Sequence, residues 1–403
     1  MEYQIVNETD TEKEVEFKIG AQELEPYIDQ SIEKLRSRIA IKGYRKGRAP
    51  KTLIRARYYD ALKAEAINDL ILDMYQKVLT EKKWQPVSNP ELVNFNDTGE
   101  IRFNLKFEIQ PDFEVENYKG LELFKEDPLP MDYLYEQALN RLREDYADIT
   151  ETHKPAAVDD FITLDLEIIE GEKIVEHQSD IVIKLGDRSF PDELNRALVG
   201  VKKGERKEVP INNQIYRIQI KKIEEKILPD INDDFARMLN YANLAEMEKG
   251  LKEMLEREEE MRLREELEEN LARILLERYR FPVPKSLVER EFQMIIKSGN
   301  HPDNESTRER FLPVAEKRAR LNLILEKIAQ KENIQVSDAR VKEFAQKNGM
   351  TESEIRGEML EYLRKIVLRN ETLQFLLNNS KIVQKSRILT PEEAKNVDRS
   401  IRH

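Results

Sequence analysis

"GYRKGRAP" (residues 43–50) is a short basic stretch with two glycines in an otherwise acidic chain of 403 residues. Ten basic residues and no acidic ones lie between Glu33 and Asp60, although the chain has a formal net charge of −12. The ten are Lys34, Arg36, Arg38, Lys42, Arg45, Lys46, Arg48, Lys51, Arg55 and Arg57. Gly43 and Gly47 let the backbone turn sharply. We call residues 43–50 the finger, and we expect a loop within a run of ten uncompensated positive charges.

Helical and strand patterns flank the finger on both sides. Residues 21–39 and 51–83 have helical patterns, and Pro50 suits the start of the second helix because its φ is fixed. The stretches "EVEFKI" (14–19) and "IRFNLKFEIQ" (101–110) alternate apolar and polar residues, as strands with one buried face do. The apolar positions are Val15, Phe17, Ile19, Ile101, Phe103, Leu105, Phe107 and Ile109. This part of the chain is predicted to be an α+β domain.

The chain changes character twice after this domain. Pro128 and Pro130 mark a break before a predicted helix over 131–147. Residues 159–223 hold short strands with turn residues between them, which indicates a small β-rich module. From about residue 230 the spacing is helical throughout, with the later helices expected at 305–331, 337–347, 351–369 and 371–379. We therefore predict an α+β multidomain fold whose large C-terminal body is all-α.

Composition excludes several classes of protein. With 36% charged residues and only 13 glycines, the chain suits long helices that have one apolar stripe and much solvated surface. The absence of cysteine excludes disulfides, thiolate catalysis and zinc–thiolate sites. The N-terminal stretch lacks the features of a signal peptide, and no run of 18 apolar residues occurs. We expect a cytoplasmic protein that does not associate with membranes.

No constellation of residues predicts catalysis. The histidines at 153, 177, 301 and 403 are scattered, and none has a second ligand at helical spacing. Neither a phosphate-binding glycine loop nor a dinucleotide fingerprint is present. The adjacent carboxylates at 159–160 and at 233–234 would point apart. We therefore expect no catalytic residue, no metal site and no cofactor.

The charges of the finger can be interpreted in two ways. Exposed bases around two glycines would bind phosphates with an affinity that falls steeply with salt, and Tyr44 would add an apolar anchor or a stacking surface. Alternatively, the stretch is a solvated connection between two helices with incidental lysines and arginines. Charge alone does not decide between them.

The finger closely resembles the tip of the trigger factors, a family of bacterial ribosome-associated chaperones. The family pattern is Gly-Phe-Arg-x-Gly-Lys/Arg-x-Pro, and Tyr44 keeps the aromatic ring of the phenylalanine. The resemblance implies docking on the large ribosomal subunit at the polypeptide exit, in contact with a ribosomal protein and rRNA. The implied ribosome-binding residues are Gly43, Tyr44, Arg45, Lys46, Gly47 and Arg48.

The resemblance extends over the whole chain in order, through "FEIQPDFEVENYKGLEL" and the β-rich middle to "RFPVPKSLVEREF". It implies a ribosome-binding domain over 1–118, a linker over 119–150 and a module over 151–226 similar to FKBP-type prolyl isomerases. Residues 227–403 are then a helical chaperone body with arms that bind clients.

The module departs from the family pattern where an isomerase needs its aromatic pocket. Leu166 and Ile174 stand where the family has phenylalanines, and the long flap segment before "NNQIYRIQIKKI" is absent. Phe190 and Tyr216 are the aromatic residues left that could line a residual peptide pocket, although ordinary core positions fit both of them as well. Because prolyl isomerisation needs a shaped apolar pocket, we expect little activity.

The resulting interpretation is an ATP-independent chaperone that docks at the ribosomal exit tunnel and shields nascent or unfolded polypeptides. The resemblance also allows a homodimer away from the ribosome. Flexible methionines could adapt to varied clients, with a place in the helix core as the alternative for each. They are Met254, Met261, Met294, Met350 and Met359. Two rival functions stay open, namely an active prolyl isomerase and a helical scaffold whose basic loop binds RNA or a protein.

Overall fold

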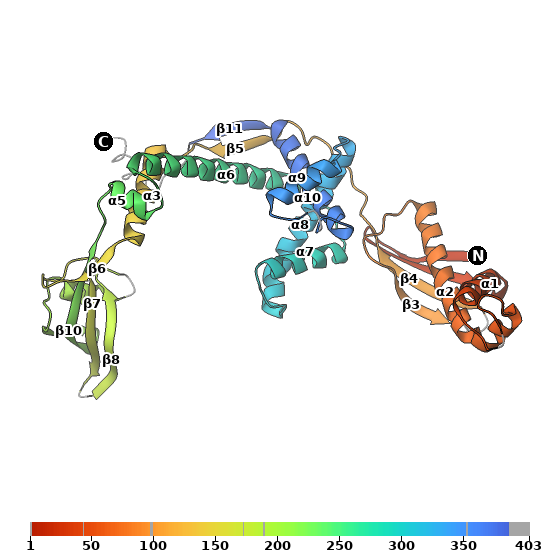
Figure 1. The fold of residues 1–403 in the computed structure, drawn as a ribbon, viewed down its shortest axis with the longest axis horizontal. Helices are drawn as coiled ribbons and strands as arrows, with labels where there is room; N and C mark the ends of the chain where they lie inside the picture. Colours follow the sequence, from red (N-terminus) through yellow and green to blue (C-terminus); the bar gives the residue numbers. More distant parts are fainter. Residues whose placement is uncertain are drawn as a thin grey trace. The chain divides into compact units, whose positions relative to one another are not determined.

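The computed structural model, whose helices and strands are labelled in Figure 1, divides into two compact units. The first combines residues 1–125 with residues 266–383, and the second is built on residues 126–265. The predicted α+β fold with a helical C-terminal body is confirmed. The structure describes residues 2–42, 44–96, 100–171, 173–187, 190–351 and 354–386.

The N-terminal sheet has four antiparallel strands. Their spatial order is β1 (Glu2–Glu8), β2 (Glu12–Ile19), β4 (Ile101–Glu108) and β3 (Glu91–Asn96). Helices α1 (Ala21–Arg38) and α2 (Lys51–Lys82) share one hydrophobic core with this sheet. The eight apolar residues predicted to face inward are all buried, and Phe17 stacks on Phe103 with ring centroids 5.0 Å apart. The alternation in β2 and β4 therefore correctly predicted two half-buried strands.

The two outer strands, β1 and β3, were not predicted from the sequence. Leu92, Val93 and Phe95 of β3 are all exposed, and no residue of β1 is buried. Strand β3 has only exposed side chains and β1 has only Tyr3 and Ile5 half-buried, so neither has a sustained two-residue alternation. Edge strands of this kind are therefore the part of a sheet that periodicity misses.

Long helices form the rest of the first unit. The C-terminal half of α6 (Leu244–Arg278) shares a core with α8 (Glu305–Lys331) and α10 (Glu358–Asn378). Helix α7 (Lys285–Ser298) packs on α8, and α9 (Asp338–Lys347) packs on α10. Each helix buries one apolar stripe, as the spacing predicted.

Two details of the predicted helical body were wrong. The helices expected at 351–369 and 371–379 are one continuous helix, α10, because Leu373 and Leu376 continue the buried stripe that includes Val367. In addition, the region after residue 230 is not helical throughout. Strand β11 (Lys381–Lys385) pairs with β5 (Glu122–Glu126), and Lys381 N donates to the carbonyl of Leu121 over 2.8 Å.

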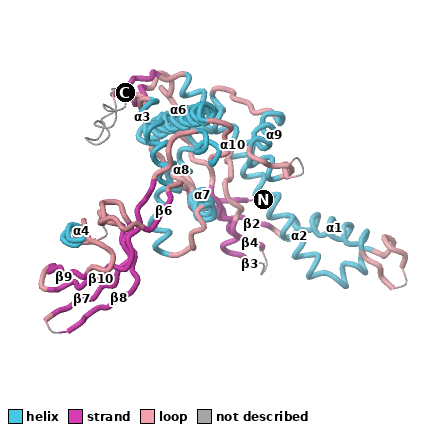
Figure 2. The backbone as a smooth tube through the Cα atoms, turned by 60° about the vertical axis from the view of Figure 1, so that its left-hand side comes forward, coloured by secondary structure: helices cyan, strands magenta, loops and turns pink. Residues whose placement is uncertain are grey.

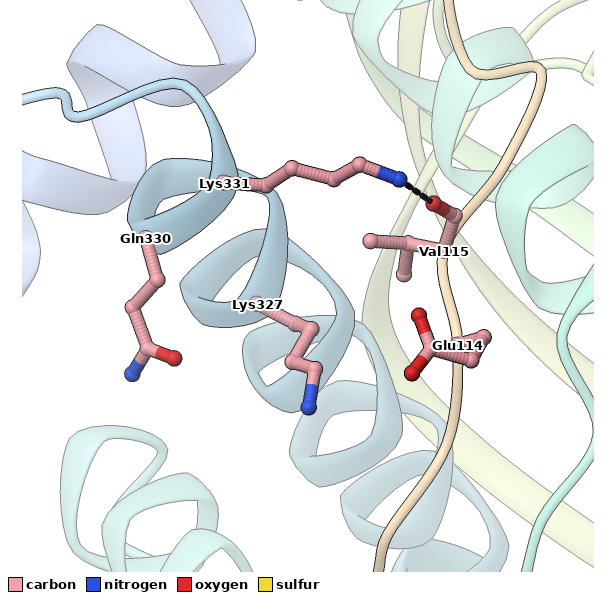
Figure 3. A pocket seen from close by; sticks show the side chains of 5 residues that line it. All are labelled: Glu114, Val115, Lys327, Gln330 and Lys331. Atoms are coloured by element: carbon pink, nitrogen blue, oxygen red, sulfur yellow. Dashed lines mark hydrogen bonds between the residues drawn. The ribbon is translucent and has the colours of Figure 1, made fainter.

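Side chains of the helical body form hydrogen bonds with the segment that leads from the N-terminal sheet to β5. Figure 3 shows Lys331 of α8 reaching this segment, where its Nζ donates to the carbonyl oxygen of Val115 over 2.7 Å. The carbonyl oxygen of Glu116 accepts a hydrogen bond from the hydroxyl of Tyr279. The cavity of about 320 Å³ drawn there is lined by Glu114, Val115, Lys327, Gln330 and Lys331. These contacts position the backbone of the segment.

The second unit contains the β-rich module, a five-stranded sheet (Figure 2). Strand β10 (Gln214–Ile227) lies at its centre and pairs with β6 (Asp148–Glu151), β7 (Phe161–Glu170) and β9 (Arg206–Ile211). Strand β8 (Lys173–Lys184) pairs with the other side of β7. The short helix α4 (Asp192–Leu198) contributes Leu194 and Leu198 to the module's core. Strand β6 begins inside the stretch expected to be a linker.

A small helical core completes the second unit. Helix α3 (Met131–Asp145), helix α5 (Asp233–Met238) and the first turns of α6 bury Leu139, Phe235 and Met247 together. Asn232 caps α5, because its side chain accepts hydrogen bonds from the backbone N–H groups of residues 234 and 235. The helix predicted over 131–147 is thus confirmed as α3.

None of the helices in the described ranges combines the length and the apolar character that a membrane span needs. Within the same ranges, no group of three or more histidine, aspartate or glutamate side chains is placed to hold a metal ion.

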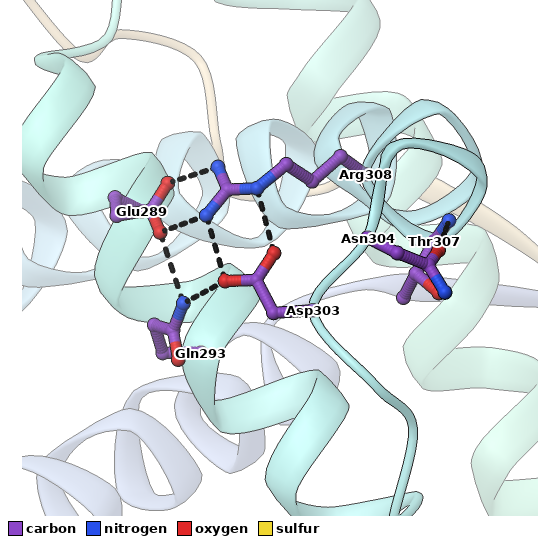
Figure 4. Close-up of polar contacts among 6 residues, drawn as sticks. All are labelled: Glu289, Gln293, Asp303, Asn304, Thr307 and Arg308. Carbon is purple, nitrogen blue, oxygen red and sulfur yellow. Dashed lines mark hydrogen bonds and ion pairs between the residues drawn. The ribbon is translucent and has the colours of Figure 1, made fainter.

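Arg308 joins helices α7 and α8 into an arm. Its guanidinium donates to both carboxylate oxygens of Glu289 over 3.0 Å, and to those of Asp303 over 2.7 and 2.8 Å (Figure 4). Gln293 donates to the same two carboxylates over 3.0 Å, and Arg308 lies 4.8 Å from the ring centroid of Phe292. Hydrogen bonds from Arg308 lower the pKa of Glu289 and the pKa of Asp303.

We predict that Glu289→Gln lowers the melting temperature of the arm near neutral pH but not in acid. A carboxyl with a lowered folded-state pKa stabilises the fold above its unfolded pKa, and this contribution is lost as the pH falls through the folded value. The unperturbed pKa values are 4.5 for Glu289 and 3.8 for Asp303. The difference in melting temperature between wild type and variant should therefore shrink from about pH 4.5 downward and vanish once the pH is below the lowered pKa of Glu289. Circular dichroism melts at each pH measure it.

The control for this experiment is Glu309→Gln on the same helix. Glu309 is exposed and has no ion pair among the described residues, so its replacement should leave the melting temperature unchanged at every pH. A constant gap between wild type and Glu289→Gln from neutral pH to acid would contradict the prediction.

Candidate functional site

The finger joins α1 to α2, and both of its ends are anchored in the core of the N-terminal domain. Ile41 and Ala49 are 7% and 5% exposed and belong to the same core as the sheet. Between them the chain turns twice, with hydrogen bonds of 2.9 Å from Tyr44 N to Ile41 O and from Arg48 N to Arg45 O. The two anchors hold the loop at a fixed place on the domain.

The predicted docking residues are the exposed part of this loop. The side chains of Tyr44, Arg45, Lys46 and Arg48 are all exposed, and Tyr44 is 45% exposed although it is aromatic. Gly47 has φ +81°, and a β-carbon built on it would meet no heavy atom within 4 Å. The left-handed backbone, not crowding, is therefore the reason for glycine at this position. Gly43 lies outside the described residues.

Four of the ten basic residues around the finger are paired with carboxylates, so the expectation of ten uncompensated charges was wrong. Glu33 forms two ion pairs, with N–O distances of 2.6 Å to Lys51 and 3.4 Å to Arg36. The other two pairs are Lys34–Asp69 at 2.6 Å and Arg55–Glu25 at 2.7 Å. The pair of Arg36 and Glu33 lies within α1, whereas the other three pairs form because α1 packs beside α2.

These pairs also shift the titration of their members. The hydrogen bond from Lys51 lowers the pKa of Glu33, and the hydrogen bond to Asp69 raises the pKa of Lys34. The hydrogen bond to Glu25 raises the pKa of Arg55. Glu33, Lys34 and Arg55 are therefore held in their charged forms, and four of the bases share three carboxylates.

The unpaired positive charges are concentrated at the tip. Of the ten bases, six have no ion-pair partner among the described residues, and all six are exposed: Arg38, Lys42, Arg45, Lys46, Arg48 and Arg57. Close by on α2, the guanidinium of Arg57 lies 5.7 Å from the ring centroid of Tyr58 and that of Arg55 lies 5.8 Å from Tyr59. A loop with this composition can bind phosphate oxygens and offer an aromatic ring beside them.

The two aromatic residues predicted to line a residual peptide pocket lie in the β-rich module. Phe190 and Tyr216 are half-buried, and both pack against the core of the module. Leu166 is buried in that core, whereas Ile174 is exposed at the start of β8. Leu166 and Ile174, which stand where the family has pocket phenylalanines, therefore differ in burial.

Exposed apolar side chains occur on the helices of both units. Met254, Met261 and Met359 are exposed, whereas Met294 and Met350 are half-buried. Sequence reasoning missed others, because a helical pattern does not show which apolar residues fall outside the buried stripe. They include Val314, Tyr362 and Met238.

Two family models match the chain. The model for "Bacterial trigger factor protein (TF)" matches residues 1–142, and the model for "Bacterial trigger factor protein (TF) C-terminus" matches residues 243–378. The chain is 31% identical over 370 residues to a trigger factor of Aquifex aeolicus, which covers 82% of this chain and 76% of that one. The chain belongs to the trigger factor family. A trigger factor of Geobacter sulfurreducens is 26% identical over 434 aligned positions, covering 93% and 97% of the two chains.

A solved chain described as "Promiscuous Substrate Recognition in Folding and Assembly Activities of the Trigger Factor Chaperone" is also similar. The match covers 94% of this chain and 99% of the solved chain, at 20% sequence identity and a TM-score of 0.43. The family assignment rests on the sequence matches. It confirms the resemblance predicted from the finger and supports a chaperone role.

We predict that a substitution at the buried Ile41, just before the finger, destabilises the domain far more than a substitution at an exposed residue of the finger. Ile41→Ala removes buried apolar contacts and should lower the free energy of unfolding of the N-terminal domain by about 2 to 4 kcal/mol. Arg45→Gln, at an exposed and unpaired position, should change it by less than about 0.5 kcal/mol. Trp84, the single tryptophan of the chain, packs against this core, so its fluorescence during urea unfolding reports on this domain. Equal effects of the two substitutions would show that the loop is not anchored in this way.

Proposed function

We propose that this trigger factor is an ATP-independent cytoplasmic chaperone that docks on the large ribosomal subunit and shields nascent or unfolded polypeptides. The separation of charge around the finger carries the docking part of the proposal. Four bases on α1 and α2 are paired, whereas the bases of the connecting loop have no ion pair among the described residues and lie around an exposed tyrosine. The family match supports the chaperone part.

The proposed docking combines ionic and aromatic contacts at the polypeptide exit. Phosphates of ribosomal RNA suit the unpaired cations, because each phosphate contact releases counterions. The planar guanidinium groups of Arg45 and Arg48 offer several donors to phosphate oxygens. Tyr44 supplies a ring that can stack on a base or fill an apolar pocket of a ribosomal protein. The remainder of the chain is acidic, so this attraction is local.

Client binding is proposed for the exposed apolar side chains on the helices. They are scattered among charged residues, so each contact with a client is weak and many contacts together give promiscuous binding. Such contacts need no nucleotide, and the sequence has no nucleotide-binding motif. The side chains that we assign to this role are Val314, Met359 and Tyr362 in the first unit and Met238, Met254 and Met261 in the second.

The proposal assigns a role to each part of the chain. Residues 1–118 dock on the ribosome, 119–150 connect, 151–226 form the degenerate FKBP-like module and 227–403 bind clients. We propose that the module contributes little prolyl isomerase activity. Leu166 lies in its core, and the half-buried Phe190 and Tyr216 pack on that same core, which supports a structural role for all three.

We predict that the variant Tyr44→Ala/Arg45→Ala/Lys46→Ala binds ribosomes at least about tenfold more weakly than wild type, because it removes the ring and two unpaired cations. Co-sedimentation with ribosomes at two salt concentrations measures this loss, and wild-type binding should weaken at the higher salt. The matched control Leu72→Ala/Lys77→Ala/Arg102→Ala removes one exposed apolar side chain and two cations elsewhere in the same domain. It should pellet like wild type.

Two further results complete this test. The finger variant should prevent aggregation of a denatured client as well as wild type does, because the client surfaces are not altered. Equal pelleting of wild type and finger variant, or no pelleting of either, would contradict docking through the finger. The basic loop would then be a solvated connection between two helices.

A further inference from the structure

Two methionines stand out on the exposed side of helix α6. Met254 is 45% exposed and Met261 is 61% exposed. They are seven residues apart, so they lie on the same side of the helix two turns from each other. The buried stripe of this part of α6, which includes Leu255 and Leu263, lies on another side. Neither methionine takes part in the hydrophobic cores of the described residues.

These thioethers are accessible to reagents in solvent, and no thiol competes with them. The chain has ten methionines and no cysteine. Met74 and Met247 are almost fully buried, so the methionines of this protein differ widely in accessibility. Several exposed glutamates surround the pair on α6, and hydrogen peroxide is uncharged, so these acids do not repel it. Accessibility favours oxidation of exposed methionines first.

Oxidation would change the property that makes this face useful to a chaperone. A sulfur lone pair attacks one oxygen of hydrogen peroxide, an S–O bond forms as the O–O bond breaks, and water is the second product. The sulfur is oxidised by two electrons and the peroxide is reduced. The sulfoxide is polar, whereas the thioether is apolar, flexible and able to fit varied partners.

We propose that Met254 and Met261 form a reversible oxidation site that controls client binding on α6. The inference rests on the proposed client-binding function. Peroxide weakens the binding of apolar client segments to this face without unfolding the helix, because neither side chain supports a core. A sulfoxide reductase with a dithiol reductant restores the thioethers and the binding.

The test uses the full-length protein and, as client probe, fluorescein-labelled, reduced and carboxymethylated lactalbumin, which stays unfolded. The protein is treated with hydrogen peroxide, freed of it, and assayed by fluorescence anisotropy. Peptide mapping by mass spectrometry should find Met254 and Met261 oxidised about tenfold faster than Met74 and Met247. Probe affinity should fall by about threefold or more at unchanged helicity, and methionine sulfoxide reductases A and B with dithiothreitol should restore it.

Paired variants assign the effect to these positions. Met254→Leu/Met261→Leu keeps an apolar face on α6 that peroxide cannot oxidise, so it should lose much less affinity on treatment than wild type does. Met238→Leu/Met359→Leu removes two exposed methionines of the other proposed client surfaces and should lose more affinity on treatment than the α6 variant does. If oxidised wild type binds as tightly as the untreated protein, or the first variant is as sensitive as wild type, the inference is overturned. If the untreated protein does not bind the probe, the proposed client-binding function fails, and this inference fails with it.

Discussion

The burial of the α1–α2 pair against the N-terminal sheet is the constraint on which the candidate docking site depends. Ile41 and Ala49 share a core with Phe17 and Phe103, so the loop between them is anchored at both ends. The same packing brings acids of α1 to bases of α2, as in the Glu33–Lys51 pair. Neutralisation of these bases leaves the unpaired charges at the tip.

The proposed client surfaces likewise depend on which faces of the helices are buried. A helix that buries one stripe leaves its remaining faces to solvent, and here those faces carry many charges and a few apolar side chains. The charges and the net charge of −12 oppose self-association, while the isolated apolar groups keep contacts with any one client weak. Docking at one cationic loop and weak binding elsewhere are therefore compatible within one acidic chain.

The sequence predicted those features whose cause is local or periodic. The strands β2 and β4 were found because each has one buried face, and the finger was found from its glycines and charges. The ion pair between Arg55 and Glu25 joins residues that are distant in the sequence, so only the packed helices reveal it. Edge strands β1 and β3 and the short strand β11 have no buried alternation, and periodicity therefore did not show them. The half-buried positions of Phe190 and Tyr216 likewise depended on how the module packs.

The central claim is that the tip of the finger contacts the ribosome, and a photo-cross-linker at position 44 tests it most directly. p-Benzoylphenylalanine in place of Tyr44 keeps an aromatic ring at an exposed position, and the same group in place of exposed Leu72 is the control. The account predicts cross-links from position 44 to protein or rRNA of the large ribosomal subunit in living cells, and none from position 72. Cross-links from position 44 to non-ribosomal partners alone, or the same products from both positions, would contradict it.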